Sequence, residues 1–469
     1  MIQERINAYF DDKALEAELV NAVSRLIAID STKGEPATGR PFGEGPEKAL
    51  EEALNISASF GLPGENLEGY VGVVDLNQEE TALHILTHLD VVAAGTGWQI
   101  TKPFTPLYQD GLLYGRGAED NKGPAIAALF ALRAVRDLGV PLRKNARLLF
   151  GTDEESGFGD IKWYYERHPF APHSFAPDAA FPLTNTEKGH FKPNITAEWP
   201  LESTTPRVTE MTGSAQINVI PPKATATILG MTEKTAMPFV RKVALSLDVD
   251  FSLTQAGESL YILCSGTGAH ASTPELGNNA LTALLTLLTK LPLADCASTR
   301  AIRGLAACFP HGDHTGKPLD IAQADDLAGA LTIALTMIRL SAIGFSAQAD
   351  GRTPLCATEE SCRSAVEAKL AMHGLKLRRA YYNPPHHTPA DSPFVQTLLK
   401  CYEQYTDDVG MCLSTGGGTY VHNIPGGVAF GATMPGFFGH LHGPDERMSV
   451  PDLLTAAKIF TQAIIDLCG

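Results

Sequence analysis

Short apolar runs alternate with amphipathic stretches over the first third of the chain. Apolar residues recur at helical spacing over 13–29, 44–60 and 123–138, which predicts three helices. Uninterrupted apolar runs of strand length predict a strand pair at 69–76 and 81–87 and a further strand at 145–150. Strands that alternate with helices in this way are typical of an α/β sheet with helices on its faces.

The pattern changes after residue 186 to alternating strand segments with Pro and Gly turns. We predict strands at 193–199, 217–228, 259–265 and 331–349, and a helix at 278–291. From residue 386 the α/β character returns, with helices at 392–405 and 450–467, a strand at 428–431 and a glycine-rich loop at 412–420. The chain is therefore predicted to be an α/β domain in two parts, 1–186 and 386–469, interrupted by an α+β domain, 187–385, that is large enough for two subdomains.

Polar residues suited to metal chemistry follow the predicted strands of the first part. His88 and Asp90 directly follow the predicted strand 81–87. Asp120 precedes the predicted helix 123–138, which is rich in small residues. One imidazole nitrogen can bind a metal while a neighbouring carboxylate accepts the other N–H. A histidine beside a buried strand is more often structural, so this pair alone is a weak indication.

Two further strand ends carry carboxylates. Glu154 and Glu155 follow the strand 145–150, and Asp178 lies in a third strand-like step at 176–181. Adjacent carboxylates point in different directions, so one can bind a metal while the other acts as a general base. The alternative is a solvated acidic turn.

The inserted segment carries polar groups without an evident packing role: Asn218, His270 in a Gly/Ser-rich turn, and Arg352 after an apolar run. A buried core histidine is less expected in such a turn, but His270 could be an exposed loop residue. Arg352 could clamp a carboxylate, or it could be a surface charge. We also assign Gly417, in the glycine-rich loop, to substrate binding. This loop is not a phosphate-binding P-loop, because no Lys-Ser/Thr follows the glycines.

Composition narrows the classes of function. The 469 residues carry a net charge of −16, which disfavours nucleic acid and anionic membranes as partners. The chain has no apolar run long enough to span a membrane and no evident signal peptide. Its eight cysteines are scattered without paired spacing, which predicts reduced thiols. We expect a cytoplasmic protein.

Five motifs occur in the order found in one enzyme family. They are Thr87–Val92, Gly115–Gly123, Thr152–Gly157, Gly266–Ala280 and His442–Glu446. Over nearly its whole length the chain resembles the dinuclear-zinc metallopeptidases, which include carnosinases, aminoacylases, glutamate carboxypeptidases and PepV-type bacterial dipeptidases. The resemblance implies a mixed-sheet α/β catalytic domain with an inserted α+β lid domain.

The resemblance also implies a metal site. Asp120 would bridge two divalent ions, with His88 and Asp178 completing one site and Glu155 and His442 the other. Zn²⁺ is expected, and Mn²⁺ or Co²⁺ would also fit this donor set. His440 is a rival for His442, but only His442 is followed by Gly-Pro-Asp-Glu as in the family.

Other roles follow from the same resemblance. Glu154 would be the general base and Asp90 the partner of His88. Lid residues Asn218, His270 and Arg352 would polarise the scissile carbonyl and hold the C-terminal carboxylate of the substrate. The chain departs from the family at Gly351, where an apolar residue is expected.

The resulting hypothesis is a metal-dependent dipeptidase acting on free dipeptides. Because the lid is large enough to close the site within one chain, we expect a monomer. The alternatives are an N-acyl-amino-acid amidohydrolase with the same metals, which Asp178 weakly disfavours, and a catalytically inactive binding protein.

Overall fold

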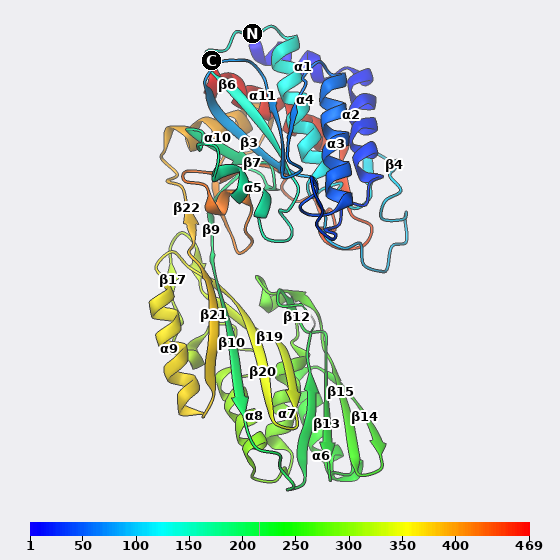
Figure 1. The fold of residues 1–469 in the computed structure, drawn as a ribbon, viewed down its shortest axis with the longest axis vertical. Helices are drawn as coiled ribbons and strands as arrows, with labels where there is room; N and C mark the ends of the chain where they lie inside the picture. The colour runs from blue at the N-terminus through cyan, green and yellow to red at the C-terminus, as the bar shows by residue number, and fades with distance from the viewer. Residues whose placement is uncertain (215) are drawn as a thin grey trace. The chain divides into compact units, whose positions relative to one another are not determined.

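The computed structural model describes residues 1–214 and 216–469, which form two compact units, each described by itself (Figure 1). The α/β unit comprises Met1–Thr186, His387–Ser414 and Gly418–Gly469. The inserted unit comprises Glu187–His386 together with the short segment Thr415–Gly417. Each unit has its own large apolar core, so neither depends on the other for burial of its apolar side chains.

The α/β unit is built on a nine-stranded mixed sheet. In spatial order its path is β1 (Glu65–Leu67), β2 (Val71–Asp75), β6 (Asn145–Gly151), β3 (Thr81–His88), β7 (His173–Ala176), β24 (Val428–Ala429), β9 (Leu183–Glu187) and β22 (His386–His387), with β23 (Cys412–Thr415) also paired to β9. Strands β6, β3, β7 and β24 are parallel neighbours, whereas β2 runs antiparallel to β6. The sheet confirms the predicted α/β class.

The prediction that 69–76 and 81–87 form a strand pair is wrong. β6 lies between β2 and β3, antiparallel to the first and parallel to the second. β3 and β6 are the longest strands of this sheet, and almost every residue in them is buried. Parallel strands of this kind occupy the middle of a sheet, so they pair with each other.

Helices cover both faces of this sheet. One face carries α1 (Ile2–Phe10), α2 (Lys13–Ile27), α3 (Glu44–Ser59), α4 (Lys122–Asp137), α10 (Pro393–Tyr405) and α11 (Val450–Cys468), whose side chains share one core with Ile85 and Leu148. The other face carries α5 (Gly159–Tyr165) and the short helix η3 (Tyr420–Asn423), which pack on Leu86 and Leu149. Alternate residues of β3 and β6 thus enter different cores, which explains their continuous hydrophobicity.

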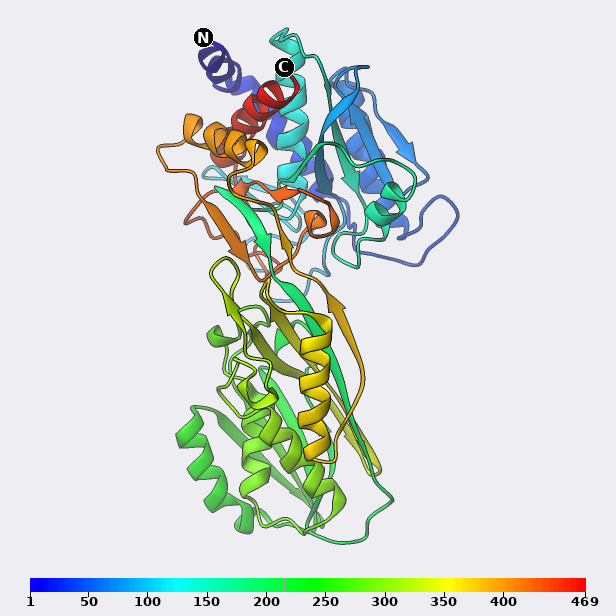
Figure 2. The ribbon, with the colours of Figure 1, turned by 90° about the vertical axis from the view of Figure 1, so that its left-hand side faces the viewer.

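The inserted unit contains an antiparallel eight-stranded sheet. Its order is β14 (Asp250–Ala256), β15 (Ser259–Ser265), β13 (Lys223–Leu229), β11 (Arg207–Thr212), β19 (Thr332–Ser341), β20 (Gly344–Thr353), β10 (Gly189–Glu198) and β21 (Lys376–Asn383). Its helices are α6 (Glu233–Leu247), α7 (Ala280–Lys290), α8 (Ala297–Cys308) and α9 (Glu359–Met372), and Figure 2 shows α9 (yellow) beside β21.

Two predicted strands of this unit are each divided. Pro221 and Pro222 interrupt 217–228 and leave β12 (Val219–Ile220) separate from β13, because proline cannot donate to a sheet ladder. Residues 331–349 fold back as the hairpin β19–β20. Short strands and helices complete the chain: β4 (Leu107–Gln109), β5 (Leu112–Tyr114), β8 (Ala179–Ala180), β16 (Ala269–His270), β17 (Ala324–Asp325), β18 (Gly329–Ala330), β25 (Ala432–Thr433), β26 (Arg447–Ser449), η1 (Pro274–Leu276) and η2 (Lys317–Leu319).

Among the helices of the described residues, none has both the length and the apolar character needed to cross a bilayer.

Candidate active site

Two groups of potential metal ligands meet at one edge of the α/β sheet. One group is His88, Asp120 and Asp178, and the other is Asp120, Glu155 and His442; within each group the ligand atoms lie within 4.8 Å of one another. His88 is the last residue of β3, and Glu155 and Asp178 follow the parallel strands β6 and β7. Parallel strands deliver their ends to the same edge, which explains this convergence.

Asp120 lies between the two imidazoles. Its Oδ1 is 2.9 Å from His88 Nε2, and its Oδ2 is 2.9 Å from His442 Nε2. His88 Nδ1 lies 3.1 Å from the carbonyl oxygen of Asp90, which can only accept a hydrogen bond. Nδ1 therefore carries a proton, and in the neutral ring Nε2 presents its lone pair to the group, as a metal ligand must.

The electrostatics of the group favour a bound cation. Burial and the charge of Asp120 raise the pKa of Glu155 to about 7. Burial opposes charge on His442, but hydrogen bonds to Asp120 and Glu155 outweigh it and raise the pKa of His442 to about 11. Burial also holds the pKa of Glu154 well above its usual range, with the charges of Asp178 and Glu155 adding to it. Buried carboxylates this close together stay ionised only when positive charge lies among them, and otherwise take up protons.

The donor set fits divalent metal ions. Imidazole nitrogens and carboxylate oxygens are the ligands that Zn²⁺, Mn²⁺ and Co²⁺ accept. His440, the rival of His442, is outside both groups, and its Nδ1 lies 3.1 Å from the carbonyl oxygen of Pro444.

Asp90 has a contact that sequence reasoning did not predict. Its carboxylate accepts the backbone N–H of Glu154 at 3.1 Å and that of Glu155 at 3.0 Å. The Oδ1 atom of Asp90 is 3.4 Å from His88 Nδ1. Asp90 thus fixes the backbone of the two glutamates in addition to lying beside His88.

A second group missed by sequence reasoning is the buried ion pair of Arg116 and Glu446, 2.6 Å apart. Glu446 also accepts the backbone N–H groups of Gly117, Glu119 and Asp120 at 3.0–3.2 Å. Arg116 Nη2 donates to the carbonyl oxygen of His442 at 3.2 Å. We call this pair the Arg116–Glu446 clasp, because it joins the segments that carry Asp120 and His442. Both residues lie inside recognised motifs, but nothing in the sequence indicates that they pair.

The four predicted substrate residues all belong to the inserted unit, where the structure brings them together. β12 pairs with β16, so that Val219 faces His270, and Ala271 N donates to the carbonyl oxygen of Asn218 at 2.8 Å. His270 lies 2.6 Å from Ser272 Oγ through its Nδ1. The segment Thr415–Gly417 packs against this turn: a Cβ on Gly416 would lie 3.0 Å from Ser272 Cβ.

Arg352 is buried beside the same segment. Its Nη1 donates to the carbonyl oxygen of Gly416 at 2.6 Å and lies 3.1 Å from His190 Nε2, and its Nη2 donates to Asp350 at 2.9 Å. Its Nε has no partner among the described residues. The unexpected Gly351 has a steric reason, since a Cβ there would lie 2.8 Å from the carbonyl oxygen of Phe191 on β10.

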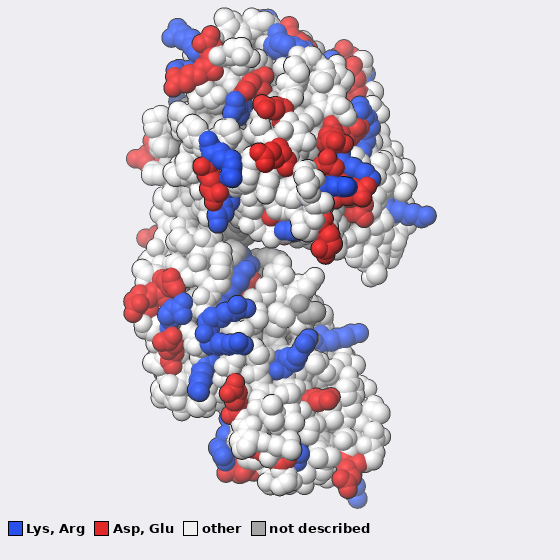
Figure 3. Space-filling view, viewed as in Figure 1, with Lys and Arg blue, Asp and Glu red and all other residues white. Residues whose placement is uncertain are grey.

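Charge is divided unequally between the units. Lys plus Arg and Asp plus Glu are equally numerous in the inserted unit, so the whole net charge of −16 belongs to the α/β unit. Figure 3 shows basic side chains on the visible face of the inserted unit. The acidic excess is therefore carried by the unit that contains the potential metal ligands.

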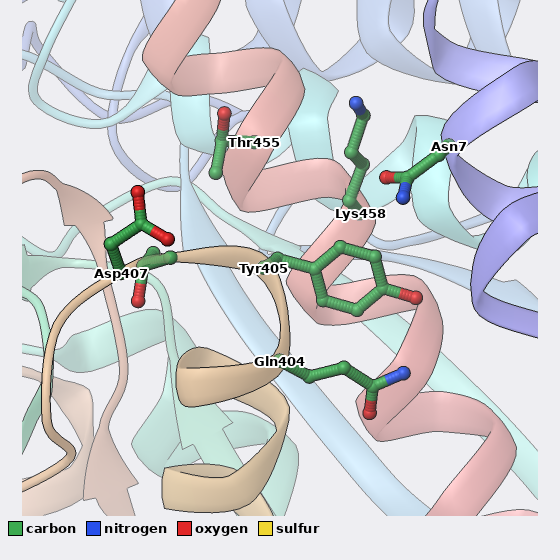
Figure 4. A pocket seen from close by; sticks show the side chains of 7 residues that line it. Asn7, Gln404, Tyr405, Asp407, Thr455 and Lys458 are labelled. Carbon is green, nitrogen blue, oxygen red and sulfur yellow. The ribbon is translucent and has the colours of Figure 1, made fainter.

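A polar surface cavity of about 250 Å³ lies elsewhere on the α/β unit, lined by Asn7, Gln404, Tyr405, Thr406, Asp407, Thr455 and Lys458 (Figure 4). The positively charged side chain in its lining, that of Lys458, already forms an ion pair, since its Nζ is 2.8 Å from Asp11 Oδ1. No predicted site residue lines it.

Known proteins resemble the chain over nearly its full length. The model of "Peptidase family M20/M25/M40" matches residues 84–466. The protein YtjP of Bacillus subtilis is 31% identical over 96% of this chain and 97% of its own. The Beta-Ala-Xaa dipeptidase of Lactobacillus delbrueckii is 30% identical over 97% of both chains. Among solved structures, the M20 family metallo-carboxypeptidase Sso-CP2 of Sulfolobus solfataricus has a TM-score of 0.57 at 16% identity, covering 95% of this chain and 98% of its own, and shares the fold.

Proposed function

Because the chain belongs to the peptidase family M20/M25/M40, we propose that it is a metal-dependent dipeptidase that hydrolyses free dipeptides. The observation that carries this proposal is the pair of ligand groups that share Asp120, with Glu154 beside them. The name of the Beta-Ala-Xaa dipeptidase, a relative along nearly the whole chain, supports a dipeptide as substrate.

In this proposal His88, Asp120 and Asp178 hold one divalent ion, and Asp120, Glu155 and His442 hold the second. Zn²⁺ is the proposed metal, with Mn²⁺ or Co²⁺ as alternatives. Two such ions, when bound, supply Lewis acidity that lowers the pKa of a water molecule and polarises a carbonyl. The side chain of Glu154 takes the proton from the attacking water and passes it to the leaving amine. The chemistry requires Glu154 to be ionised, and nearby cations favour that form.

The inserted unit has the role of a lid that recognises the peptide. His270 donates a hydrogen bond to the scissile carbonyl oxygen, where negative charge develops. Arg352 binds the C-terminal carboxylate, for which a guanidinium is well suited. Asn218 and Gly417 contribute polar contacts to the same substrate. The position of Arg352 at the Thr415–Gly417 segment, together with His270, supports this grouping.

We also propose that the protein is a cytoplasmic monomer. All eight cysteines lie among the described residues and are free thiols, which suits a reducing compartment. Sedimentation of the purified protein tests the oligomeric state, and an obligate dimer would contradict it.

The function is tested by a matched panel of substrates. We would assay α- and β-alanyl dipeptides, their N-acetylated counterparts and tripeptides with the zinc- or manganese-loaded protein and with Glu154→Ala. Turnover of free dipeptides that disappears in the variant supports the proposal. Preference for acetylated substrates would replace it by the amidohydrolase, and absence of turnover with two metals bound would favour a binding protein.

A further inference from the structure

His270 ends the short strand β16 and is followed by a tight turn. Two groups of Ser272 converge on its Nδ1: the backbone N–H at 3.2 Å and the hydroxyl oxygen at 2.6 Å. The same turn is closed by the backbone N–H of Thr273, which donates to the carbonyl oxygen of His270 at 3.1 Å. Nδ1 of His270 is therefore hydrogen-bonded by Ser272, two residues further along the chain.

The chemistry of these groups fixes the location of the ring proton. A backbone N–H can only donate, so Nδ1 must accept and cannot itself carry a proton. A neutral imidazole with an unprotonated Nδ1 carries its proton on Nε2. We infer that Ser272 is a positioning residue that holds His270 as the Nε2–H tautomer, so that His270 acts as a neutral hydrogen-bond donor.

His88 shows that the chain uses the opposite arrangement where the opposite role is needed. Its Nδ1 faces a carbonyl oxygen and so donates, which leaves the lone pair on Nε2 for a metal ion. At His270 a donor faces Nδ1 and leaves the proton on Nε2. The local backbone thus selects a ligand in the first case and a donor in the second.

The turn is held in place from a further direction. Gly416 lies so close that a Cβ there would be 3.0 Å from Ser272 Cβ, and the carbonyl oxygen of Gly416 accepts from Arg352. Ser272 therefore lies within a packed turn, whereas the His270 side chain is exposed and is held at Nδ1 by its contacts with Ser272.

The consequence for catalysis rests on the proposed function. A donor that is already oriented toward the carbonyl oxygen costs no reorganisation when charge develops there. His270 in this form gives up no proton, so the acid–base steps stay with Glu154. Ser272 acts only through His270.

The tautomer is tested by nitrogen NMR of the zinc-loaded protein labelled at histidine, with the His270 signals identified from their loss in His270→Asn. We expect an unprotonated Nδ1 and a protonated Nε2 in the unaltered protein. Ser272→Ala loses the hydroxyl but keeps the backbone N–H at Nδ1, so we expect only a partial shift of the ring toward protonated Nδ1. A protonated Nδ1 in the unaltered protein overturns the inference. This measurement needs no turnover, so it stands even if dipeptides are not hydrolysed and the proposed function fails.

Kinetics test the role. Ser272→Ala should lower kcat about 10-fold with KM unchanged, in the range seen when an imidazole loses its orienting partner. Ser272→Thr, which keeps the hydroxyl, should restore most of the rate. In a His270→Ala background, itself about 10²–10³-fold slower, Ser272→Ala should cost nothing more. An equal loss in both backgrounds would show a general structural role for Ser272 and overturn the inference.

Discussion

His84 and His88 lie four residues apart on the same face of β3, and their surroundings give them different chemistry. Burial lowers the pKa of His84 to about 4, and the charge of Arg147 adds to this. Burial also opposes charge on His88, but Asp178 and Asp120 outweigh it and raise the pKa of His88 well above its usual range. One histidine is thus a neutral core residue, and the other belongs to an acidic group. The sequence shows a histidine on a strand in both cases.

We expect His84 to make the fold sensitive to mild acid. The unfolded chain binds a proton near pH 6.5, whereas folded His84 binds one only near pH 4, so stability decreases as the pH falls between these values. The loss from pH 7.5 to pH 5 should be about 2 kcal/mol for this residue. Urea unfolding in the presence of a chelator, at both pH values, checks it. His84→Gln should lose about 2 kcal/mol less than the unaltered protein, and equal losses would contradict the prediction.

The amide contacts of Asp90 give a second prediction. Asp90→Asn keeps the shape but places an NH₂ group against the backbone N–H of Glu154 or Glu155, where a carboxylate oxygen now accepts. We expect kcat to fall about 10–100-fold because the two glutamates lose their position. Asp75→Asn is the matched control, since Asp75 pairs with Arg147 on another strand. Steady-state kinetics of both variants test this prediction. If kcat of Asp90→Asn equals that of Asp75→Asn, the amide contacts of Asp90 are dispensable.

At the level of elements, the positions of the potential metal ligands depend on the ends of three strands and on one loop. β3, β6 and β7 deliver His88, Glu155 and Asp178, while the loop before β26 delivers His442. The Arg116–Glu446 clasp connects this loop to the segment before α4. The relative position of the two segments therefore rests on one buried ion pair and its amide contacts.

Glu446→Gln should loosen the proposed metal site that contains His442. The amide removes the charge opposite Arg116 and presents donors to the backbone N–H groups of Gly117 and Glu119. We expect metal affinity to fall 10- to 100-fold for one of two ions, and the free energy of unfolding to fall by about 3–5 kcal/mol. Competition with a chelator and urea unfolding measure these effects. Glu44→Gln, which removes an exposed pair with Lys48, should change neither, and unchanged affinity in Glu446→Gln would refute the role of the clasp.

The strand ends explain which parts of the site could be predicted from the sequence. His88, Glu154 and Glu155 each follow an apolar run, so that local pattern places them at the edge of a sheet. The Arg116–Glu446 clasp spans 330 residues, and no local pattern reports a contact of that separation. Strand order escaped prediction for the same reason, since hydrophobicity identifies β2, β3 and β6 as strands without showing which two are neighbours.

In the whole molecule, the inserted unit interrupts the α/β unit at a point where the two flanking segments of the α/β unit lie side by side. Thr186 and His387 flank the insertion, and Thr186 Oγ1 lies 2.9 Å from His387 Nδ1. Each unit has its own core, so the α/β unit loses no core residue when the insertion is removed. The ligand groups are all in the α/β unit.

Replacement of 187–386 by a short turn should therefore leave a folded α/β unit that still binds two metal ions but does not hydrolyse dipeptides. Metal stoichiometry and the panel of dipeptides measure the two properties separately. Retained hydrolysis would show that the inserted unit is not needed for catalysis, and loss of metal binding would show that it supports the ligand groups.

The unequal division of charge has a consequence for how the protein would acquire the proposed metal ions. Because the whole excess of negative charge lies on the α/β unit, a cloud of counterions gathers around the part of the molecule that contains the ligands. Divalent cations are enriched in that cloud, and added salt displaces them because it shortens the reach of the field. Metal uptake, followed by stopped flow with a coloured chelator, should be several-fold faster at 10 mM than at 500 mM sodium chloride. In dilute buffer the protein would then retrieve trace metal efficiently, and its activation would depend on the ionic strength of its surroundings.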